Sequence, residues 1–400
     1  MSSRYPAGVI SKTAPTPSGP YQNSTAPGIW TMEQAAYWIK QGNWPTYGNI
    51  IRQLWSWGRN NNGQLGLGNI TNYSSPKQVG ALTTWSSVAC GVHHTVAIQT
   101  NGTLWSWGLN NNGQLGLGNT TNYSSPKQVG ALTTWLRTAC GYRHTIAIQT
   151  NGTLWSWGYN AQGQLGLGNT TYYSSPKQVG ALTTWSSIAC GGYYTVAIQT
   201  DGTLWSWGRN NYGQLGQGNT ANKSSPNQVG SLTTWSNVAC GNSHTVAVQT
   251  NGTLWSWGMN NVGQLGLGNQ TYYSSPKQVG ALTTWSSASG GIFHTVAIQT
   301  NGTLWSWGYN GNGQLGLGNI TNYSSPKQVG ALTTWLRTAC GYYHTVAIQT
   351  NGTLWSWGYN AQGQLGLGNI TNYSSPKQVG ALTTWLRAAS GGYYTTAIHS

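Results

Sequence analysis

This sequence contains few residues that could carry out acid–base catalysis. Glu33 and Asp201 are the only carboxylates in 400 residues, and general acid–base chemistry usually needs a positioned carboxylate or a histidine with a shifted pKa. Asp201 occupies a turn position where the other full copies of a repeat carry Asn, so a Ser-His-Asp arrangement would depend on a turn residue. The segment GQLGLG lacks the Lys-Ser/Thr of a phosphate-binding loop and recurs in almost every copy. We therefore expect no catalytic residues and a protein that is not an enzyme.

Histidine and cysteine recur once per repeat instead of in clusters. Five histidines hold one repeat position, with Tyr194 and Tyr394 in two further copies: His94, His144, His244, His294 and His344. Five cysteines hold another, with Gly290 and Ser390 in the remaining copies: Cys90, Cys140, Cys190, Cys240 and Cys340. A metal needs several ligands at one point, and an odd number of cysteines spaced by 50 residues is a poor disulfide framework. We expect no metal and no cofactor, packing or hydrogen-bonding histidines, and small buried cysteines.

Short strands in a 50-residue repeat must position these side chains. The copy that starts at Trp85 contains three β-type segments, which we name strands A, B and C: WSSVACG (85–91), HTVAIQT (94–100) and TLWSWG (103–108). A fourth strand, D, follows Pro126 as KQV (127–129) and suits a sheet edge, because proline lacks the backbone donor. Each copy therefore predicts a small antiparallel sheet of four strands.

Two features of the B–C hairpin support that prediction. Asn101-Gly102 tolerates positive φ angles and predicts a two-residue turn between strands B and C. In strand C, Trp105 and Trp107 alternate with Ser106, so both indoles should lie on one face of the sheet. One small sheet cannot cover two indoles, but stacked sheets can.

The copy number predicts an all-β, seven-bladed β-propeller of four-stranded antiparallel blades, with an open β-solenoid as the alternative. The first copy begins at strand C (Gln53–Trp57) and continues to strand D (Lys77–Val79). The chain ends with strand A (Trp385–Gly391) and strand B (Tyr394–Ser400). We expect these four strands to form a closing blade shared between the N-terminal and C-terminal strands.

The motifs WSWGxNxxGQLGLGN and ACGxxHTVAIQTNG, repeated over residues 53–400, resemble those of the regulator of chromosome condensation repeat family. The resemblance implies a seven-bladed propeller with a split closing blade. The best-known activities of that family are guanine nucleotide exchange on a small GTPase and nucleosome binding. They use charged residues on loops and inserted segments that this sequence lacks, so the fold carries over and the exchange activity does not.

Residues 1–50 differ in composition from the repeats and predict an N-terminal arm beside a propeller at 51–400. Within Ala26–Pro45, Thr31 begins a capping box and Gly42 ends a short helix at about 32–41. This segment is similar to short segments of tailed-bacteriophage structural proteins, which implies attachment to other virion proteins. The attachment residues would be Trp30, Trp38, Ile39 and Trp44. The alternative is a helix that packs under the propeller rim.

The charge balance favours an anionic partner. Seventeen Lys and Arg face two acids, for a net charge of +15, and charged residues are only 5% of the chain. Such an excess suits nucleic acid, a phosphorylated glycan or an acidic protein surface; the alternative is solubility for a surface otherwise made of uncharged polar residues. No apolar run approaches the ~20 residues of a membrane span, so we expect no membrane insertion.

The copies differ mainly in two places, after strand C and between strands A and B. In an antiparallel A-B-C-D sheet both places lie at the same end, so one face of the disc varies while the other stays nearly constant. The variable residues are rich in Tyr and Arg, as binding loops are; the alternative is drift in tolerant loops. The candidate ligand-binding residues are Arg59, Tyr142, Arg143, Tyr159, Tyr193, Arg209, Tyr212, Phe293, Tyr309, Tyr342, Tyr343, Tyr359 and Tyr393.

Two functions follow from these features. The first is a non-enzymatic virion surface, decoration or fibre protein that recognises a host surface glycan, an envelope component or a neighbouring virion protein, located on the virion or another extracellular surface. The second is a cytoplasmic propeller scaffold that binds protein or nucleic acid through the same face. Binding to nucleic acid would weaken steeply with salt.

Overall fold

The computed structural model describes residues 4–5, 8–9 and 51–400. The chain divides into two compact units, Met1–Ile51 and Arg52–Ser400. In the first unit, β1 (Arg4–Tyr5) pairs antiparallel with β2 (Gly8–Val9).

The expected arm helix at about 32–41 and the attachment residues Trp30, Trp38, Ile39 and Trp44 lie outside the described residues. Among the residues that are described, none belongs to a helix that could span a membrane.

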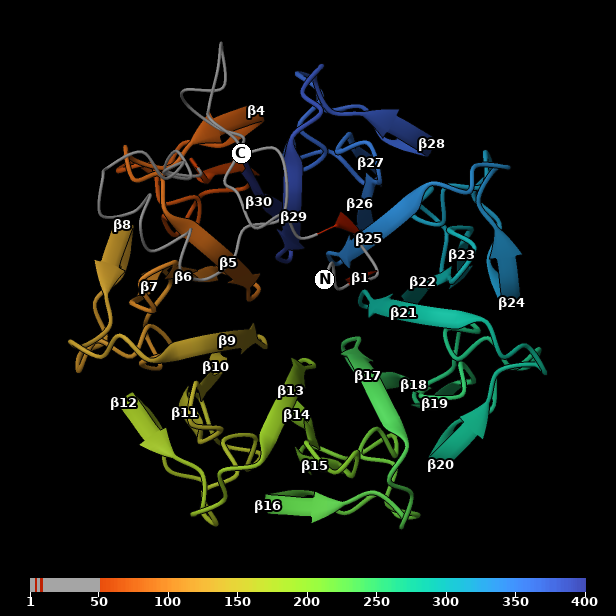
Figure 1. The fold of residues 1–400 in the computed structure, drawn as a ribbon, viewed down its shortest axis with the longest axis horizontal. Helices are drawn as coiled ribbons and strands as arrows, with labels where there is room; N and C mark the ends of the chain where they lie inside the picture. The colour runs from red at the N-terminus through yellow and green to blue at the C-terminus, as the bar shows by residue number, and fades with distance from the viewer. Residues whose placement is uncertain (1–3, 6–7, 10–50) are drawn as a thin grey trace. The chain divides into compact units, whose positions relative to one another are not determined.

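Within residues 51–400, the strands form seven four-stranded antiparallel sheets that stand around a central channel like blades (Figure 1). Strand A of each sheet is innermost and strand D is outermost, and in six of the sheets the four strands are consecutive along the chain. The sheets therefore have the expected blade topology.

The strand bounds repeat with a 50-residue period. The A strands are β5 (Trp85–Cys90), β9 (Trp135–Cys140), β13 (Trp185–Cys190), β17 (Trp235–Cys240), β21 (Trp285–Gly290), β25 (Trp335–Cys340) and β29 (Trp385–Ser390). The B strands are β6 (His94–Gln99), β10 (His144–Gln149), β14 (Tyr194–Gln199), β18 (His244–Gln249), β22 (His294–Gln299), β26 (His344–Gln349) and β30 (Tyr394–His399). The C strands are β3 (Gln53–Gly58), β7 (Leu104–Gly108), β11 (Leu154–Gly158), β15 (Leu204–Gly208), β19 (Leu254–Gly258), β23 (Leu304–Gly308) and β27 (Leu354–Gly358). The D strands are β4 (Tyr73–Gln78), β8 (Tyr123–Gln128), β12 (Tyr173–Gln178), β16 (Lys223–Gln228), β20 (Tyr273–Gln278), β24 (Tyr323–Gln328) and β28 (Tyr373–Gln378).

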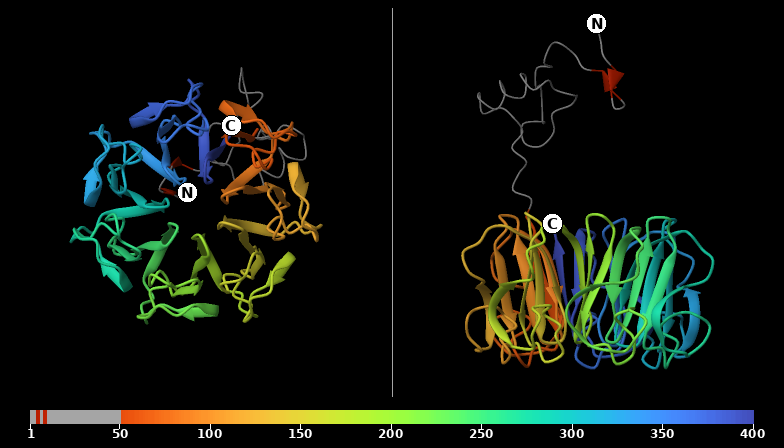
Figure 2. Two further views of the ribbon diagram at one scale, coloured as in Figure 1. Left: turned by 180° about the vertical axis from the view of Figure 1, so that it is seen from behind. Right: turned by 90° about the horizontal axis from the view of Figure 1, so that it is seen from below.

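The closing blade joins the two ends of the repeat region, as expected. Its strand order is β29-β30-β3-β4, and the register between β3 and β30 runs from Gln53 opposite His399 to Gly58 opposite Tyr394. The A strands contact one another all the way around the channel, including β29 with β5 and β25 with β29. Figure 2 shows the resulting closed ring from behind and from the side, so the open solenoid is wrong. We number this blade 1; β5–β8 form blade 2, and the remaining blades follow in chain order to blade 7 (β25–β28).

Tryptophans fill the spaces between blades. In blade 3, Trp135 packs edge-on against Trp155 and Trp157 at 6.1 Å, so the two indoles of strand C share a face. The same cluster contains Val96 and Leu104 of blade 2, and burial of each large apolar side chain contributes about 2–3 kcal/mol. The indole Nε1 of Trp157 also donates a hydrogen bond to the Gln114 carbonyl in the preceding blade, at 3.0 Å. Each blade therefore depends on its neighbour for its core.

The hairpin turn and strand D differ in detail from their sequence predictions. Gly102 has a φ of 78°, but Asn101 does not have a positive φ. The Gly102 amide donates to the Gln99 carbonyl, and the last backbone bond of the hairpin joins the Gln99 amide to the Thr103 carbonyl. The loop therefore has three residues, 100–102, instead of two. Strand D begins at Tyr123, before Pro126, because an irregularity in the edge pairing accommodates the proline.

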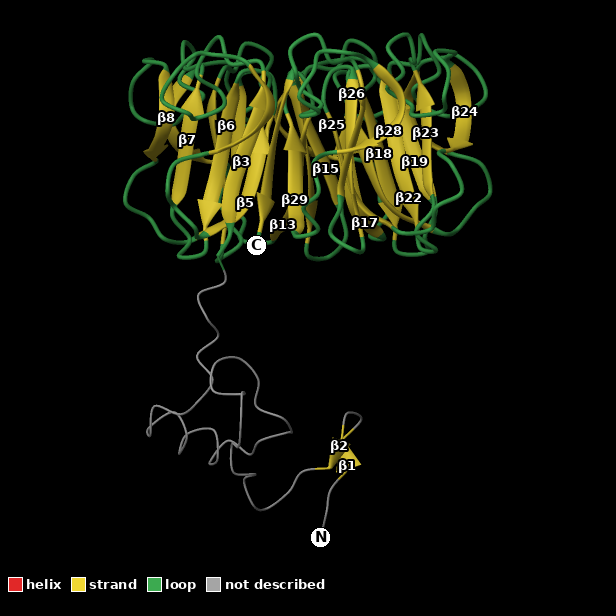
Figure 3. Ribbon diagram, turned by 90° about the horizontal axis from the view of Figure 1, so that it is seen from above, coloured by secondary structure: helices red, strands yellow, loops and turns green. Residues whose placement is uncertain are grey.

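The disc has two faces, and Figure 3 shows the strands running between them. One face carries the A–B turns and the long C–D loops; we call it the A–B/C–D face. The other carries the B–C turns and the D–A connections, and we call it the B–C/D–A face. The C terminus follows strand B of blade 1 and marks the second face (Figure 3).

Candidate binding face

The variable residues converge on the A–B/C–D face, as expected from the antiparallel order of the strands. The A–B turns connect the two innermost strands, so their residues lie next to the channel mouth; the first residues after strand C lie just outside them. The backbone of each A–B turn bonds to the first residue of the C–D loop of the same blade, as in the Tyr359 amide bonded to the Tyr343 carbonyl at 2.8 Å. The two variable positions of each blade are therefore neighbours.

Aromatic side chains from several blades form one continuous network on this face. Each ring lies 4.7–6.5 Å, centroid to centroid, from the next ring along the network. The ten rings are Phe293, Tyr309, Tyr343, Tyr359, Tyr393, Tyr342, Tyr142, Tyr193, Tyr159 and Tyr172. Most pairs are edge-on or tilted, which is the favourable arrangement for aromatic quadrupoles. Nine of these ten side chains are only half-buried and Tyr172 is exposed, so the network keeps an accessible surface.

Tyr142 and Tyr342 meet over the channel mouth with their rings 5.5 Å apart, although they belong to blades 3 and 7. Burial raises the pKa of Tyr142 to about 12, and burial and the neighbouring Tyr142 hydroxyl raise the pKa of Tyr342 well above its ordinary value. Gly392, in the equivalent position of blade 1, leaves room for Tyr342, because a Cβ added there would lie 3.4 Å from the Tyr342 ring. Below the two tyrosine rings lies a cavity of about 140 Å³ lined by the Cys-Gly ends of the A strands. The two tyrosines therefore bridge different sides of the channel mouth at this face.

Cationic groups lie beside the aromatic network. The Arg59 guanidinium lies 5.9 Å from the centre of the Tyr393 ring, a cation–π contact. Between Arg59 and Arg143, in blade 2, lies His93; burial, followed by repulsion from these two arginines, lowers the pKa of His93 to about 4. Arg143 is exposed. The face thus combines aromatic area with positive charge, and the one carboxylate within residues 51–400, Asp201, lies in a B–C turn on the other face.

The structure gathers most, but not all, of the predicted residues. Arg59 and nine of the predicted aromatic residues belong to the network or contact it. Arg209 and Tyr212 form a separate group with Tyr272, at 5.8 Å and 5.7 Å.

Tyr172 and Tyr272 were not among the predicted residues. They replace an asparagine found in most copies, such as Asn122, whose side chain accepts the Asn110 amide at 2.7 Å. Tyrosine in place of this asparagine could have identified both residues from the sequence, because it is a further difference between copies in the C–D loop.

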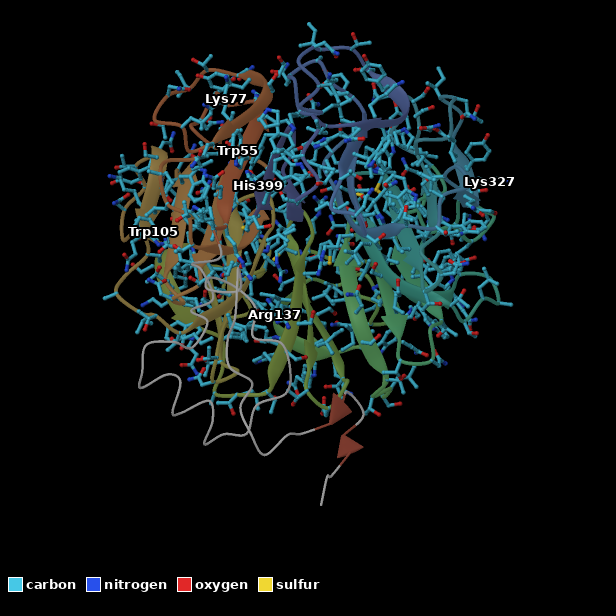
Figure 4. The ribbon with its side chains drawn as sticks, turned by 45° about the horizontal axis from the view of Figure 1, so that its top comes forward. Trp55, Lys77, Trp105, Arg137, Lys327 and His399 are labelled. Atoms are coloured by element: carbon cyan, nitrogen blue, oxygen red, sulfur yellow. The ribbon has the colours of Figure 1, made fainter. Side chains whose placement is uncertain are left out.

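The lysines of the SSPK segment lie on the outer rim, but not next to this face. Figure 4 labels Lys77 and Lys327 at the edge of the disc. Each lies near the end of strand D that leads to the B–C/D–A face, and the Lys77 ammonium reaches back to 5.5 Å from the Tyr73 ring. These lysines therefore lie closer to the B–C/D–A face than to the variable loops.

The repeated histidines are structural, as expected. The His94 Nε2 atom lies 3.0 Å from the Thr145 hydroxyl of the next blade, and the other four make the same contact. Burial lowers the pKa of each of these histidines to about 3, so they are neutral near pH 7.

The cysteines are free thiols that are half-buried at the channel wall, not fully buried as expected. Desolvation there raises the pKa of Cys240 and Cys340 to about 12, which disfavours the reactive thiolate. Across the described ranges, no three His, Cys, Asp or Glu side chains gather in a way that could hold a metal ion.

Comparison with known families gives a match over the whole propeller. The model of the regulator of chromosome condensation (RCC1) repeat matches seven segments: 53–98, 101–148, 151–198, 201–248, 251–298, 301–348 and 351–398. A second model of the same repeat matches six segments between residues 85 and 364.

Curated relatives match over a short region. The Protein RCC2 homolog of Xenopus laevis is 44% identical over 54 residues, which are 13% of this chain and 10% of that protein. The Protein RCC2 homolog of Danio rerio is also 44% identical over 54 residues, or 11% of its length. The matched region therefore spans about a tenth of these relatives.

Solved structures show the same fold. Human WBSCR16 superposes with a TM-score of 0.79 at 23% identity, over 87% of this chain and 99% of its own. Prp20p from Saccharomyces cerevisiae, reported with its binding properties to Gsp1p and histones, has a TM-score of 0.79 at 21% identity, over 87% of this chain and 91% of its own. These named relatives come from cellular organisms, and none of these matches supports the resemblance of residues 26–45 to bacteriophage proteins.

Proposed function

Because the chain belongs to the regulator of chromosome condensation repeat family, we propose that it is a cellular, non-enzymatic propeller scaffold that holds a partner protein on its A–B/C–D face. The observation that carries the proposal is the network of ten contacting aromatic rings on that face. In a chain whose copies are otherwise nearly identical, these aromatics occupy the positions that vary.

Physical chemistry favours a protein partner. Tyrosine and arginine are enriched at the energetic centres of protein interfaces, because they supply large contact area and hydrogen-bonding groups with few rotatable bonds. The network crosses the channel mouth at Tyr142 and Tyr342 and extends outward along a C–D loop to Tyr172. Many of the side chains in the surrounding loops are uncharged and polar. With Arg59 and Arg143 at its edge and no acidic side chain from residues 51–400 on that face, the surface suits a partner segment that presents acidic and apolar side chains.

Attachment to a virion and recognition of a host glycan have less support. The residues that motivated virion attachment, 26–45, lie outside the described part of the chain. The relatives named above are cellular proteins, which favours the cellular scaffold.

The proposal is tested by removing three half-buried tyrosines from the network. The variant carries Tyr309→Ala, Tyr343→Ala and Tyr359→Ala. Each substitution removes aromatic contact area worth about 1–2 kcal/mol at an interface. We therefore expect the triple variant to lose partner proteins that the unchanged protein binds in an extract of its own cells. Quantitative mass spectrometry of the retained material measures the loss.

The matched control removes three tyrosines from strand D on the rim: Tyr73→Ala, Tyr323→Ala and Tyr373→Ala. It should keep the partners, and both variants should melt within a few degrees of the unchanged protein. Retention of the same partners by the network variant would refute the proposal. If the retained material is instead destroyed by nuclease and released steeply by salt, the partner is nucleic acid.

A further inference from the structure

A second cluster of charge lies at the opposite end of the channel. Three of the seven A strands carry Leu-Arg where the others carry two small polar residues. The arginines are Arg137, Arg337 and Arg387, and each pairs with the equivalent isoleucine of strand B, so all three lie at the same height in the ring. They are the third residues of the innermost strands, near the B–C/D–A face, and all three are exposed. Figure 4 labels Arg137 near the middle of the disc, in contrast to the lysines at the rim.

A fourth arginine completes the cluster. Arg52 precedes β3, and its amide bonds to the Thr83 carbonyl at 2.7 Å while its carbonyl accepts the Trp85 amide at 3.2 Å. These bonds hold Arg52 beside the start of the A strand of blade 2. Blade 2 lies between blade 1, which carries Arg387, and blade 3, which carries Arg137, and its own A strand has no arginine. The Nε of Arg52 is buried and has no hydrogen-bond partner among the described residues. The four arginines thus occupy consecutive positions on one side of the channel mouth.

Residues 51–400 contain a single acidic side chain against these four arginines. It is Asp201, in the B–C turn of blade 4, where it accepts the Thr203 amide and hydroxyl. Glu33 is the only other acid of the chain, and one carboxylate cannot balance four guanidinium groups. Partial desolvation, followed by repulsion from Arg337, Arg137 and Arg52, lowers the pKa of Arg387, as expected for cationic groups grouped at one channel mouth.

The opposite side of the same mouth is polar and uncharged. Blades 4, 5 and 6 place Ser187, Asn237 and Ser287 at the position of the arginines, in the same register with strand B. Hydroxyl and amide groups donate hydrogen bonds to oxyanions. The channel mouth is therefore lined by donors all around, with the positive charge on one side.

We propose that this channel mouth, formed by Arg52, Arg137, Arg337 and Arg387, binds a small polyanion that carries several phosphate or carboxylate groups. Guanidinium groups pair with both oxyanions through two parallel hydrogen bonds. The site lies on the face opposite the aromatic network and is independent of the proposed scaffold function.

The arrangement favours a compact anion over a nucleic acid strand. A strand needs positive charges along a track that follows its backbone. The B–C turns and D–A connections of this face, such as TNGT and GALTTW, carry no Lys or Arg. Arg137, Arg337 and Arg387 lie instead on innermost strands, and Arg52 lies beside the start of another. The four are thus grouped at the channel mouth, where one small ligand could contact several of them.

The test compares two triple variants that lose the same charge. In Arg137→Ser, Arg337→Ser and Arg387→Ser, each arginine becomes the residue that blades 2, 4 and 6 already hold. In Lys127→Asn, Lys327→Asn and Lys377→Asn, each rim lysine becomes the residue that Asn227 represents in blade 4. Both variants keep residues that the fold already accepts at these positions, and both lower the net charge by three.

Isothermal titration calorimetry with inorganic tripolyphosphate and with citrate, at about 0.1 M salt where distant charges are screened, measures binding. We expect the unchanged protein and the lysine variant to bind one equivalent of at least one probe with similar affinity. The arginine variant should bind at least about 100-fold more weakly, because three charge-assisted contacts are lost. The tighter of the two probes identifies phosphate or carboxylate as the preferred group.

Three outcomes would overturn the inference: no binding of either probe by the unchanged protein, equal weakening by both variants, or binding of a single-stranded oligonucleotide that tripolyphosphate cannot displace. Melting temperatures of the three proteins, measured without ligand, show whether each variant is folded.

Discussion

The histidines of strand B show how one side chain can be both polar and fully structural. His144 is buried, and its Nε2 lies 3.2 Å from the Thr195 hydroxyl of the next blade. Where a blade has tyrosine instead, the phenol spans the same interface: the Tyr394 hydroxyl donates to the His94 carbonyl at 2.6 Å. Both residues form hydrogen bonds between neighbouring blades, which is why a copy can carry either one without a change of fold.

These histidines predict a steep loss of stability in acid. The folded-state pKa of about 3 lies below the ordinary value near 6.5, so the unfolded chain binds more protons. Stability is complete above pH 6.5 and falls as the pH drops from 6.5 toward 3, by about 1.4 kcal/mol per pH unit for each histidine. Urea unfolding at pH 7, 6, 5 and 4 should show this slope.

The substitution His144→Tyr, which copies blades 1 and 4, should make the slope shallower by about one proton, and Tyr194→His should make it steeper. An unchanged slope in both variants would show that these histidines do not set the acid sensitivity.

At the scale of one element, the B–C turn depends on a single glycine. Gly152 has a φ of 78°, and a Cβ added there would meet the Thr183 carbonyl of the following D–A connection. The turn is also closed by side chains, since the Thr153 hydroxyl donates to Asn151 at 2.7 Å and accepts the Trp155 indole N–H at 3.0 Å. These contacts explain why TNGT hardly varies between copies, although it lies on the surface.

The substitution Gly152→Ala should lower the free energy of unfolding by about 2–3 kcal/mol, from the strained φ and the clash together. Gly180→Ala is the matched control, because Gly180 has a φ of 61° but no atom within 4 Å of an added Cβ; it should cost only about 1 kcal/mol. Chemical denaturation measures both. Equal losses would mean that the backbone angle alone matters at this turn.

At the scale of the whole molecule, ring closure holds the disc together. Blade 1 takes β29 and β30 from the end of the chain, and Trp57 packs edge-on against Trp385 at 6.1 Å. Without those strands, β3 would present an unpaired edge and the core of blade 1 would be open to water.

Removal of residues 385–400 should therefore destabilise the entire ring. The buried Trp385, Tyr394 and Ile398 side chains contribute about 2–3 kcal/mol each, and the exposed edge invites aggregation. Size-exclusion chromatography and thermal unfolding should show aggregates and a lower melting temperature. A peptide of residues 385–400 added in trans should restore the monomer; a truncated chain that stays monomeric and equally stable would show that the ring does not need its closure.

The sequence by itself determined the blade number, the order of strands and the shared closing blade. Hydrophobic alternation and turn residues specify each strand and hairpin locally, and the truncated first copy shows which strands the closing blade lacks. It also placed Tyr309, Tyr343 and Tyr359 on one face, since antiparallel order alone decides which loops lie together. Only the tertiary structure brought Tyr142 of blade 3 against Tyr342 of blade 7, and Arg387 toward Arg52, because these contacts cross the channel axis or join distant parts of the chain. Such neighbours depend on the closure and radius of the ring, which no local pattern of residues encodes.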